Sequence, residues 1–243
     1  MRRMKHLLSL EELASVDMEQ ILAASATMKS ERGRHPRLPL AGQTWALIFN
    51  KSSTRTRVSF EVGIRELGGQ ALFLSAQDIQ IGRGELVKDT ARVLGRMIHG
   101  AIIRTYAQSD VEQFAQYSGV PTVNALTDQE HPCQVLSDIF TFQEKRGRIG
   151  GKVVTFIGDG ACNVPVSWVW AASKLEFEFR IAAPAAFIFF LVVKIATKED
   201  VPLGVIAMTR NGTWGLDWNS LPVMAHCHLT EGGQPEFDLK RRT

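Results

Sequence analysis

Cysteine is scarce in this sequence of 243 residues. Only Cys133, Cys162 and Cys227 occur, and they lie far apart. An odd and sparse count argues against a disulfide framework and fits a reducing compartment, so we expect a cytoplasmic protein. None of the three is spaced like a set of zinc ligands, which argues against a cysteine-based structural zinc site.

We expect neither a membrane-spanning helix nor a secretory segment. The apolar stretch at residues 187–193 is too short to cross a bilayer as a helix, and we expect a buried or aggregation-prone strand there. The basic start at residues 1–6 is not followed by an apolar core of useful length, so we expect no secretory peptide.

Charge of one sign shows only a small excess. The net charge of +3 argues against nucleic acid as a partner and is compatible with a small anionic substrate. Hydrophobic residues make up 45% and charged residues 22% of the chain, which is ordinary globular usage. The length suits one large domain or two small ones with a real core.

Short apolar runs alternate with helical patterns along most of the chain, which predicts an α/β fold with a parallel sheet. The strands are expected at residues 45–49, 71–74, 101–104, 121–124 and 153–157, with a half-exposed strand at 177–181. The helices are expected at residues 9–31, with Ser9 as cap and Glu12 three residues later, and then at 57–67, 89–97, 111–117, 132–144 and 163–172. Ligands bind at the carboxyl ends of such strands.

A cluster of hydroxyl and guanidinium groups stands between the first strand and the next helix, at residues 52–57 (Ser-Ser-Thr-Arg-Thr-Arg). A helix start offers free N–H groups and partial positive charge, and Ser53, Thr54 and Thr56 add donors. Arg55 and Arg57 add guanidinium groups that can grip phosphate oxygens in pairs. The cluster therefore predicts a site for a phosphate dianion, although a plain capped helix with two solvated arginines has the same pattern.

A second motif, Glu130-His131-Pro132-Cys133-Gln134, opens the helix expected at residues 132–144. Pro132 suits a first helical turn, and His131 and Gln134 are three residues apart on that turn. A neutral histidine can donate to a carbonyl oxygen, and a glutamine can accept from an NH2 group. These side chains suit a carbamoyl group, whereas His131 taken alone suits a structural role.

Together these motifs resemble those of the aspartate and ornithine carbamoyltransferases, because residues 49–61 closely match the family's carbamoyl-phosphate motif. The resemblance implies two parallel-sheet domains of the carbamoyltransferase type, at 1–147 and 148–243, the second incomplete or altered. It implies that carbamoyl phosphate is bound by Ser53, Thr54, Arg55, Thr56 and Arg104, with Arg104, Thr56, His131 and Gln134 catalytic. It also implies a homotrimer in which Gln80 reaches a neighbouring subunit's site, with no metal, cofactor or covalent intermediate.

The loop at residues 158–164 (Gly-Asp-Gly-Ala-Cys-Asn-Val) bears on the amine acceptor. By itself it reads as a tight turn with Asn163 as a helix cap. It is similar to the ornithine carbamoyltransferase loop whose asparagine holds the α-carboxylate, so the resemblance implies that Asn163 binds L-ornithine and that the product is L-citrulline, in arginine biosynthesis or arginine and citrulline metabolism.

The resemblance extends from about residue 8 to about residue 187 and then ends. The Ser-Met-Gly motif that grips ornithine in the family is absent, and Cys227 lies in a string that only partly matches the family's His-Cys-Leu-Pro. Two alternatives therefore stand beside ornithine carbamoylation. One is a truncated relative that binds carbamoyl phosphate or only oligomerises without turnover, and the other is an aspartate or other carbamoyltransferase.

Overall fold

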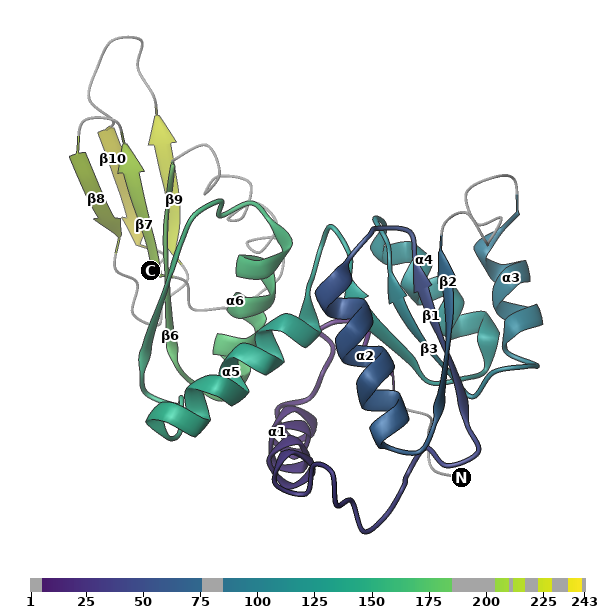
Figure 1. Cartoon of the computed structure of the whole chain (residues 1–243). Helices are drawn as coiled ribbons and strands as arrows, with labels where there is room; N and C mark the ends of the chain where they lie inside the picture. The colour runs from purple at the N-terminus through teal and green to yellow at the C-terminus, as the bar shows by residue number, and fades with distance from the viewer. Residues whose placement is uncertain are drawn as a thin grey trace. The chain divides into compact units, whose positions relative to one another are not determined.

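The computed structural model describes residues 6–75 and 85–184 and, as backbone alone, four strands nearer the C-terminus (Figure 1). The chain forms two compact units. The first consists of Met1–Lys152 and Cys162–Phe177, and the second of Val153–Ala161 and Glu178–Thr243. The domain boundary expected at residue 147 stays a prediction.

A four-stranded parallel sheet forms the centre of the first unit and confirms the predicted α/β class. Its strands are β1 (Thr44–Phe49), β2 (Gln70–Ser75), β3 (Gly100–Arg104) and β4 (Thr122–Leu126). Their order is β2-β1-β3-β4, so the chain passes from β1 to β2 on one side and then to β3 and β4 on the other. The direction of winding therefore reverses between β1 and β3.

The helices of the first unit connect these strands or extend beyond them. They are α1 (Ser15–Ser30), α2 (Thr54–Glu66), α3 (Val87–Leu94), α4 (Gln108–Ser118), α5 (Pro132–Arg146) and α6 (Asn163–Leu175). All six lie within a few residues of their predicted positions, except at the start of α1. None of the helices in the described ranges is long and apolar enough to cross a bilayer.

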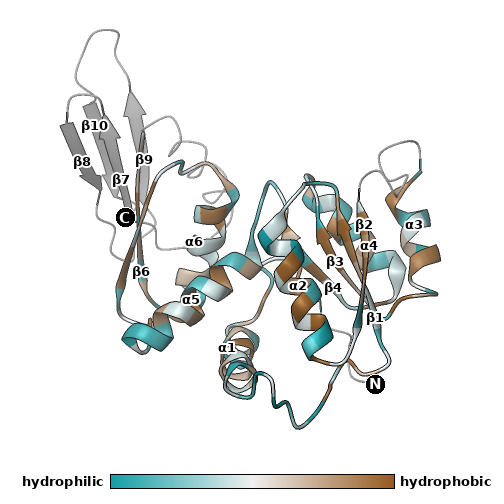
Figure 2. Ribbon diagram, in the orientation of Figure 1, coloured by the Kyte–Doolittle hydropathy of each residue, from teal (hydrophilic) through white to brown (hydrophobic). Residues whose placement is uncertain are grey.

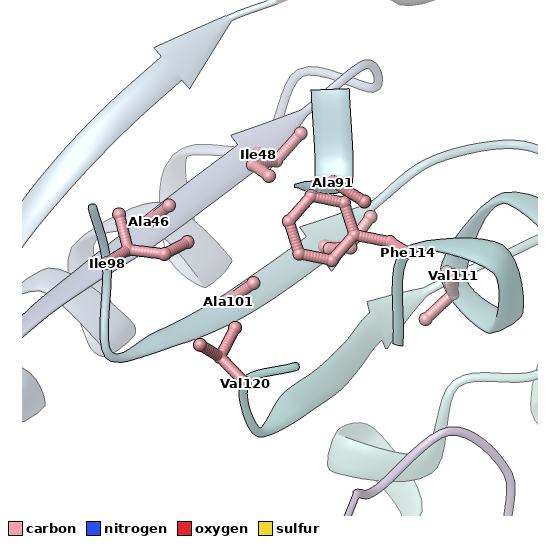
Figure 3. Packing of buried hydrophobic residues seen from close by; sticks show 9 residues of the cluster. Ala46, Ile48, Ala91, Ile98, Ala101, Val111, Phe114 and Val120 are labelled. Carbon is pink, nitrogen blue, oxygen red and sulfur yellow. The ribbon is translucent and has the colours of Figure 1, made fainter. Parts of the chain in front are cut away.

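Hydrophobic packing covers both faces of the first sheet, and Figure 2 shows hydrophobic stretches on its strands and on the helices beside them. Side chains of β1 alternate between the two faces, as a strand requires. Ala46 and Ile48 join a cluster that includes Phe114 of α4 (Figure 3), while Leu47 and Phe49 pack in a second cluster with Ile64 of α2. Helices therefore hold β1 from both sides, which fixes the position of the loop that follows it.

The predicted helix start at Ser9 is wrong, because α1 begins at Ser15. The Ser9 hydroxyl accepts a hydrogen bond from the N–H of Glu11 but donates to the Glu130 carboxylate, 121 residues away. This long-range partner replaces the expected capping box with Glu12.

The second unit contains a sheet of order β5-β6-β7-β8 and a separate β9–β10 hairpin. The strands are β5 (Val153–Ile157), β6 (Glu178–Pro184), β7 (Gly204–Thr209), β8 (Gly212–Leu216), β9 (Val223–His228) and β10 (Glu236–Arg241). Strands β5, β6 and β7 are parallel, whereas β8 is antiparallel to β7. Parallel strands agree with the predicted class, while the C-terminal strands lack the helices of a complete βα series in the part of the chain that is described.

Burial in this second sheet is only partly as predicted. Phe179 and Ile181 of β6 are buried while Glu178 is exposed, which confirms the alternation. The expected burial of β5 is wrong, because Ile157 is 78% exposed. Among the described strands, β5 lies at the edge of its sheet and pairs only with β6. The apolar stretch at 187–193 lies outside the described residues.

Two glycines in helical segments allow a paired test of the packing in the first unit. A Cβ at Gly95, the C-cap of α3, would lie 1.8 Å from the carbonyl oxygen of Ser118, whereas a Cβ at Gly63 within α2 would meet nothing within 4 Å. We expect Gly95→Ala to lower the free energy of unfolding by about 1–3 kcal/mol through overpacking. Gly63→Ala should raise it by about 0.5–1 kcal/mol through helix propensity.

Urea titrations of both variants beside the parent chain measure this difference. Equal effects of the two substitutions would contradict the close approach of α3 to the end of α4.

Candidate functional site

Three loops meet at the carboxyl edge of the first sheet, after β1, β3 and β4. The register places Phe49 of β1 beside Arg104 of β3, and the N–H of Asn50 donates to the Arg104 carbonyl over 2.8 Å. The Asn50 side chain donates to the Thr105 hydroxyl, 3.1 Å away, which ties the first two loops together. This edge coincides with the reversal of winding between β1 and β3, where open α/β sheets bind ligands.

The predicted phosphate loop forms the start of α2. Ser53 is the N-cap, and its hydroxyl accepts from the Thr56 N–H over 3.3 Å and donates to the Thr56 hydroxyl over 2.9 Å. Thr54 and Arg55 are exposed, and Arg55 has no ion pair or hydrogen bond among the described residues. The first-turn N–H groups of a helix have no intrahelical acceptors, so this start offers several donors to an anion.

Arg57, which the sequence placed among the phosphate-gripping groups, has other partners. Its guanidinium lies 3.6 Å from the centre of the Phe73 ring, and its Nε is 3.4 Å from the Glu61 carboxylate. The spacing of two residues puts Arg55 and Arg57 on different sides of the helix. The structure thus separates the two arginines that the motif presents together.

Arg104 ends β3 with part of its side chain buried. The register of β3 with β4 shifts between Ile103 and Arg104, so that Ile103 faces Asn124 while Arg104 faces Leu126. Such irregularities re-aim side chains at the ends of strands. Burial lowers the pKa of Arg104, and its Nε is buried without a hydrogen-bond partner in the described structure. An unpaired buried guanidinium nitrogen is suited to an anionic oxygen supplied by a ligand.

His131 is the N-cap of α5, with Pro132 in the first turn as predicted. Burial, and then the nearby charge of Arg104, lower the pKa of His131 to about 4. The imidazole is therefore neutral near pH 7. Its Nδ1 is buried and has no partner within the described ranges, which leaves it available to a ligand.

The other side chains of this helix start differ in exposure. Gln134 is exposed and donates to Asp138 over 2.8 Å. Cys133 donates to the carbonyl of Asn124, and burial raises its pKa to about 12. A thiol with such a pKa is a poor nucleophile.

Asn163 begins α6, whose N-cap is Cys162, so the alternative of Asn163 as a cap is wrong. The Asn163 side-chain amide instead donates to the carbonyl of Thr127, in the loop that precedes His131. This contact lies within the first unit. Gln80, the remaining predicted site residue, lies outside the described residues.

Sequence reasoning missed two sets of contacts around these loops. Lys51 pairs with Asp128 and places its ammonium 4.5 Å from the centre of the Tyr106 ring, so it links all three loops. Glu130 is buried and accepts from the Ser9 hydroxyl and the Leu10 N–H. A carboxylate directly before the His-Pro pair was the available signal for Glu130, but its distant partners could not be read from spacing.

The arrangement as a whole combines a helix start with hydroxyl and guanidinium donors, a buried arginine nitrogen and a neutral imidazole. The helix start, with its hydroxyl and guanidinium donors, suits a phosphate dianion. The arginine and imidazole suit an adjoining carbonyl oxygen on which negative charge develops. The geometry supports acyl-type chemistry on a phosphorylated substrate.

Residues 5–144 match the family described as aspartate/ornithine carbamoyltransferase, carbamoyl-P binding domain. The chain is 59% identical over 187 residues to the ornithine carbamoyltransferase of Akkermansia muciniphila, a match that covers 76% of this chain and 61% of that protein. It is 50% identical over 185 residues to the ornithine carbamoyltransferase of Campylobacter fetus, covering 76% and 60%. The chain thus spans about three fifths of the length of these curated relatives.

Solved structures give the same picture. The ornithine carbamoyltransferase of Burkholderia thailandensis is 44% identical, with a TM-score of 0.71 over 75% of this chain and 63% of that one. The ornithine carbamoyltransferase of Pyrococcus furiosus is 41% identical, with a TM-score of 0.72 over 79% and 64%.

The protonation of His131 provides a test of the site's electrostatics. NMR titration of its imidazole should give a pKa near 4, and Arg104→Gln should raise this pKa without restoring the ordinary value of 6.5, because burial is the larger cause. Arg55→Gln serves as the control, since Arg55 is not a source of the shift. An imidazole that titrates near 6.5 in the parent chain would contradict the buried, neutral histidine.

Proposed function

The chain belongs to the aspartate/ornithine carbamoyltransferase family, and we propose that it binds carbamoyl phosphate and transfers the carbamoyl group to the δ-amine of L-ornithine. The products would be L-citrulline and phosphate. The observation that carries the proposal is the carboxyl edge of the first sheet, where the loop before α2 bonds to Arg104 and the charge of Arg104 acts on His131. The Nε of Arg104 and the Nδ1 of His131 are buried without partners among the described residues.

The phosphate group would bind at the start of α2. Ser53, Thr54, Arg55 and Thr56 would supply hydroxyl, N–H and guanidinium donors, and Arg104 would reach the same phosphate from β3. A dianion satisfies several first-turn N–H groups together with the guanidinium of Arg55, which has no partner among the described residues. The hydroxyl of Ser53, which now bonds to Thr56, is close enough to reorient toward a ligand.

The carbamoyl group would lie between Arg104 and the start of α5. Attack by the δ-amine on the carbonyl carbon places negative charge on the carbonyl oxygen, which Arg104, His131 and Thr56 would stabilise as donors. A neutral His131 can donate without the cost of holding a second cation beside Arg104. Gln134 would accept from the carbamoyl NH2, which requires its exposed side chain to leave Asp138.

The tetrahedral intermediate would collapse by expelling phosphate, and the nitrogen would lose a proton to give citrulline. Catalysis would come from positioning and charge stabilisation, with no covalent enzyme intermediate. The proposal assigns no metal and no cofactor.

Ornithine as acceptor is supported by the relatives, which are named ornithine carbamoyltransferases. Asn163 would hold the α-carboxylate, and its present bond to the Thr127 carbonyl keeps its amide beside the His131 loop. Gln80 from a neighbouring subunit would complete the carbamoyl-phosphate site in a homotrimer. A cytoplasmic role in arginine metabolism is the corresponding biological proposal.

Binding of carbamoyl phosphate without turnover is the second candidate. It is favoured by the sequence after about residue 187, where the family resemblance ends and the given residues contain no Ser-Met-Gly motif. The two candidates share the first substrate site and differ in the second.

The shared site is tested by calorimetry with carbamoyl phosphate and a pair of arginine variants. Arg55→Ala should weaken binding roughly 10- to 100-fold, because hydrogen bonds to charged groups contribute about 1.5–3 kcal/mol each. Arg57→Ala is the matched control and should bind like the parent, since Arg57 contacts Phe73 and Glu61 instead. Equal losses in both variants would point to a diffuse charge effect and overturn the assignment.

Turnover is tested by incubating the purified chain with carbamoyl phosphate and L-ornithine and measuring citrulline. The full proposal expects citrulline well above the amount formed by Arg55→Ala. When aspartate replaces ornithine as acceptor, no carbamoyl aspartate should form. Tight binding of carbamoyl phosphate with citrulline at the level of Arg55→Ala would instead support the second candidate.

A further inference from the structure

A buried carboxylate lies directly before His131. Glu130 is only 5% exposed, and its carboxylate accepts from three donors in two segments of the first unit. The donors are the Ser9 hydroxyl, the Leu10 N–H at 2.9 Å and the Ser167 hydroxyl at 3.4 Å. All are neutral, so no ion pair among the described residues compensates this carboxylate.

Ser167 of α6 connects that carboxylate to the histidine. Its hydroxyl donates to Glu130 and accepts from the His131 N–H over 2.8 Å. The His131 N–H can only donate, so the Ser167 oxygen accepts from it and the Ser167 hydroxyl proton is directed at Glu130, whose pKa is raised by burial. The direction of both bonds is therefore defined.

The main chain of this loop is held at the same point. The Glu130 N–H donates to the Thr127 hydroxyl over 3.1 Å, and the Thr127 N–H donates to the Glu130 carbonyl over 2.9 Å. The imidazole Nδ1 of His131, by contrast, has no partner in the described parts of the chain. The orientation of the imidazole thus depends on how its backbone is held, and the relay through Ser167 holds it.

We propose that Glu130 is a positioning residue that acts through Ser167 to fix the His131 backbone, so that the imidazole faces the carbamoyl group beside Arg104. The inference rests on the proposed function for the identity of that group. A carboxylate buried without a cation is a costly way to fill space, and its three bonds to neutral donors give it a directional role.

The relay is tested with Ser167→Ala, which removes the link and leaves Glu130 its bonds to Ser9 and Leu10. Ser137→Ala is the matched control, because that serine is exposed on α5 and bonds only to the Cys133 carbonyl among described groups. Glu130→Ala removes the carboxylate, and Glu130→Gln is the rescue variant, since an amide can accept from Leu10 and Ser167 and donate to the Ser9 hydroxyl.

The first measurement uses the ligand-free chain. Hydrogen exchange of the His131 amide should accelerate roughly tenfold or more in Ser167→Ala and Glu130→Ala, because exchange follows local opening of the hydrogen bond. It should stay near the parent rate in Ser137→Ala and be restored largely by Glu130→Gln. If the exchange rate of the His131 amide in Ser167→Ala equals that of the parent chain, the relay is overturned. This outcome can be read even if Glu130→Ala does not fold.

The second measurement is calorimetry with two probes, carbamoyl phosphate and inorganic phosphate. Ser167→Ala should weaken carbamoyl phosphate about tenfold, the effect of one misplaced hydrogen-bonding group, and inorganic phosphate less than about twofold. If Ser167→Ala weakened the affinity for both probes equally, or for neither, the proposal that Ser167 helps position His131 toward the carbamoyl group would be overturned. If the parent chain binds no carbamoyl phosphate, the proposed function fails, while the amide exchange still decides whether Glu130 and Ser167 position His131.

Discussion

The parallel pairing of β1 with β3 is the constraint on which the other features of the first unit depend. It sets Phe49 beside Arg104 and lets the Asn50 N–H bond to the Arg104 carbonyl. The chain leaves these strands in opposite directions, so the start of α2 and the end of β3 are adjacent although about fifty residues separate them in sequence. A slip of one residue would turn the side chains of β1 to the wrong faces and break both hydrophobic clusters.

Burial at the carboxyl edge of the first sheet changes the protonation properties of its side chains. Burial lowers the pKa values of both Arg104 and His131, and each has a buried nitrogen with no partner in the described structure. Such groups cost folding free energy that an anionic ligand can return, which is how preorganised sites stabilise developing charge. The neutral donors around Glu130 and the Lys51–Asp128 pair hold the loops that present them.

Most of the first unit could be predicted from the sequence, because its strands are short apolar runs and its helices have local start signals. Pro132 predicted the start of α5 correctly, and in the second unit the alternation in β6 predicted its burial. Ser9 was misread because a hydroxyl that caps a helix and one that bonds a distant carboxylate have the same local sequence. Exposure of Ile157 depends on the neighbours of an edge strand, which periodicity does not report.

In the candidate site too, local features could be predicted from the sequence and contacts between distant segments could not. Ser53 as N-cap and the helix start follow from local sequence. The contact of Arg57 with Phe73 instead depends on packing between α2 and β2. The lowered pKa of His131 depends on burial and on the charge of Arg104, which the sheet brings close although the two residues lie in different loops. No rule of sequence spacing predicts that proximity. The motifs therefore indicated candidate residues, and the topology explains why Arg104 and His131 lie close together.

Family membership and the matched region make the first substrate site the central claim for this chain, which spans about three fifths of its curated relatives. The most direct measurement is a crystal structure of the chain with carbamoyl phosphate bound. The account predicts the phosphate at the start of α2 against Ser53 and Arg55, with the carbamoyl oxygen between Arg104 and His131. A ligand bound elsewhere, or a phosphate held at α2 with the carbamoyl group turned away from His131, would contradict it.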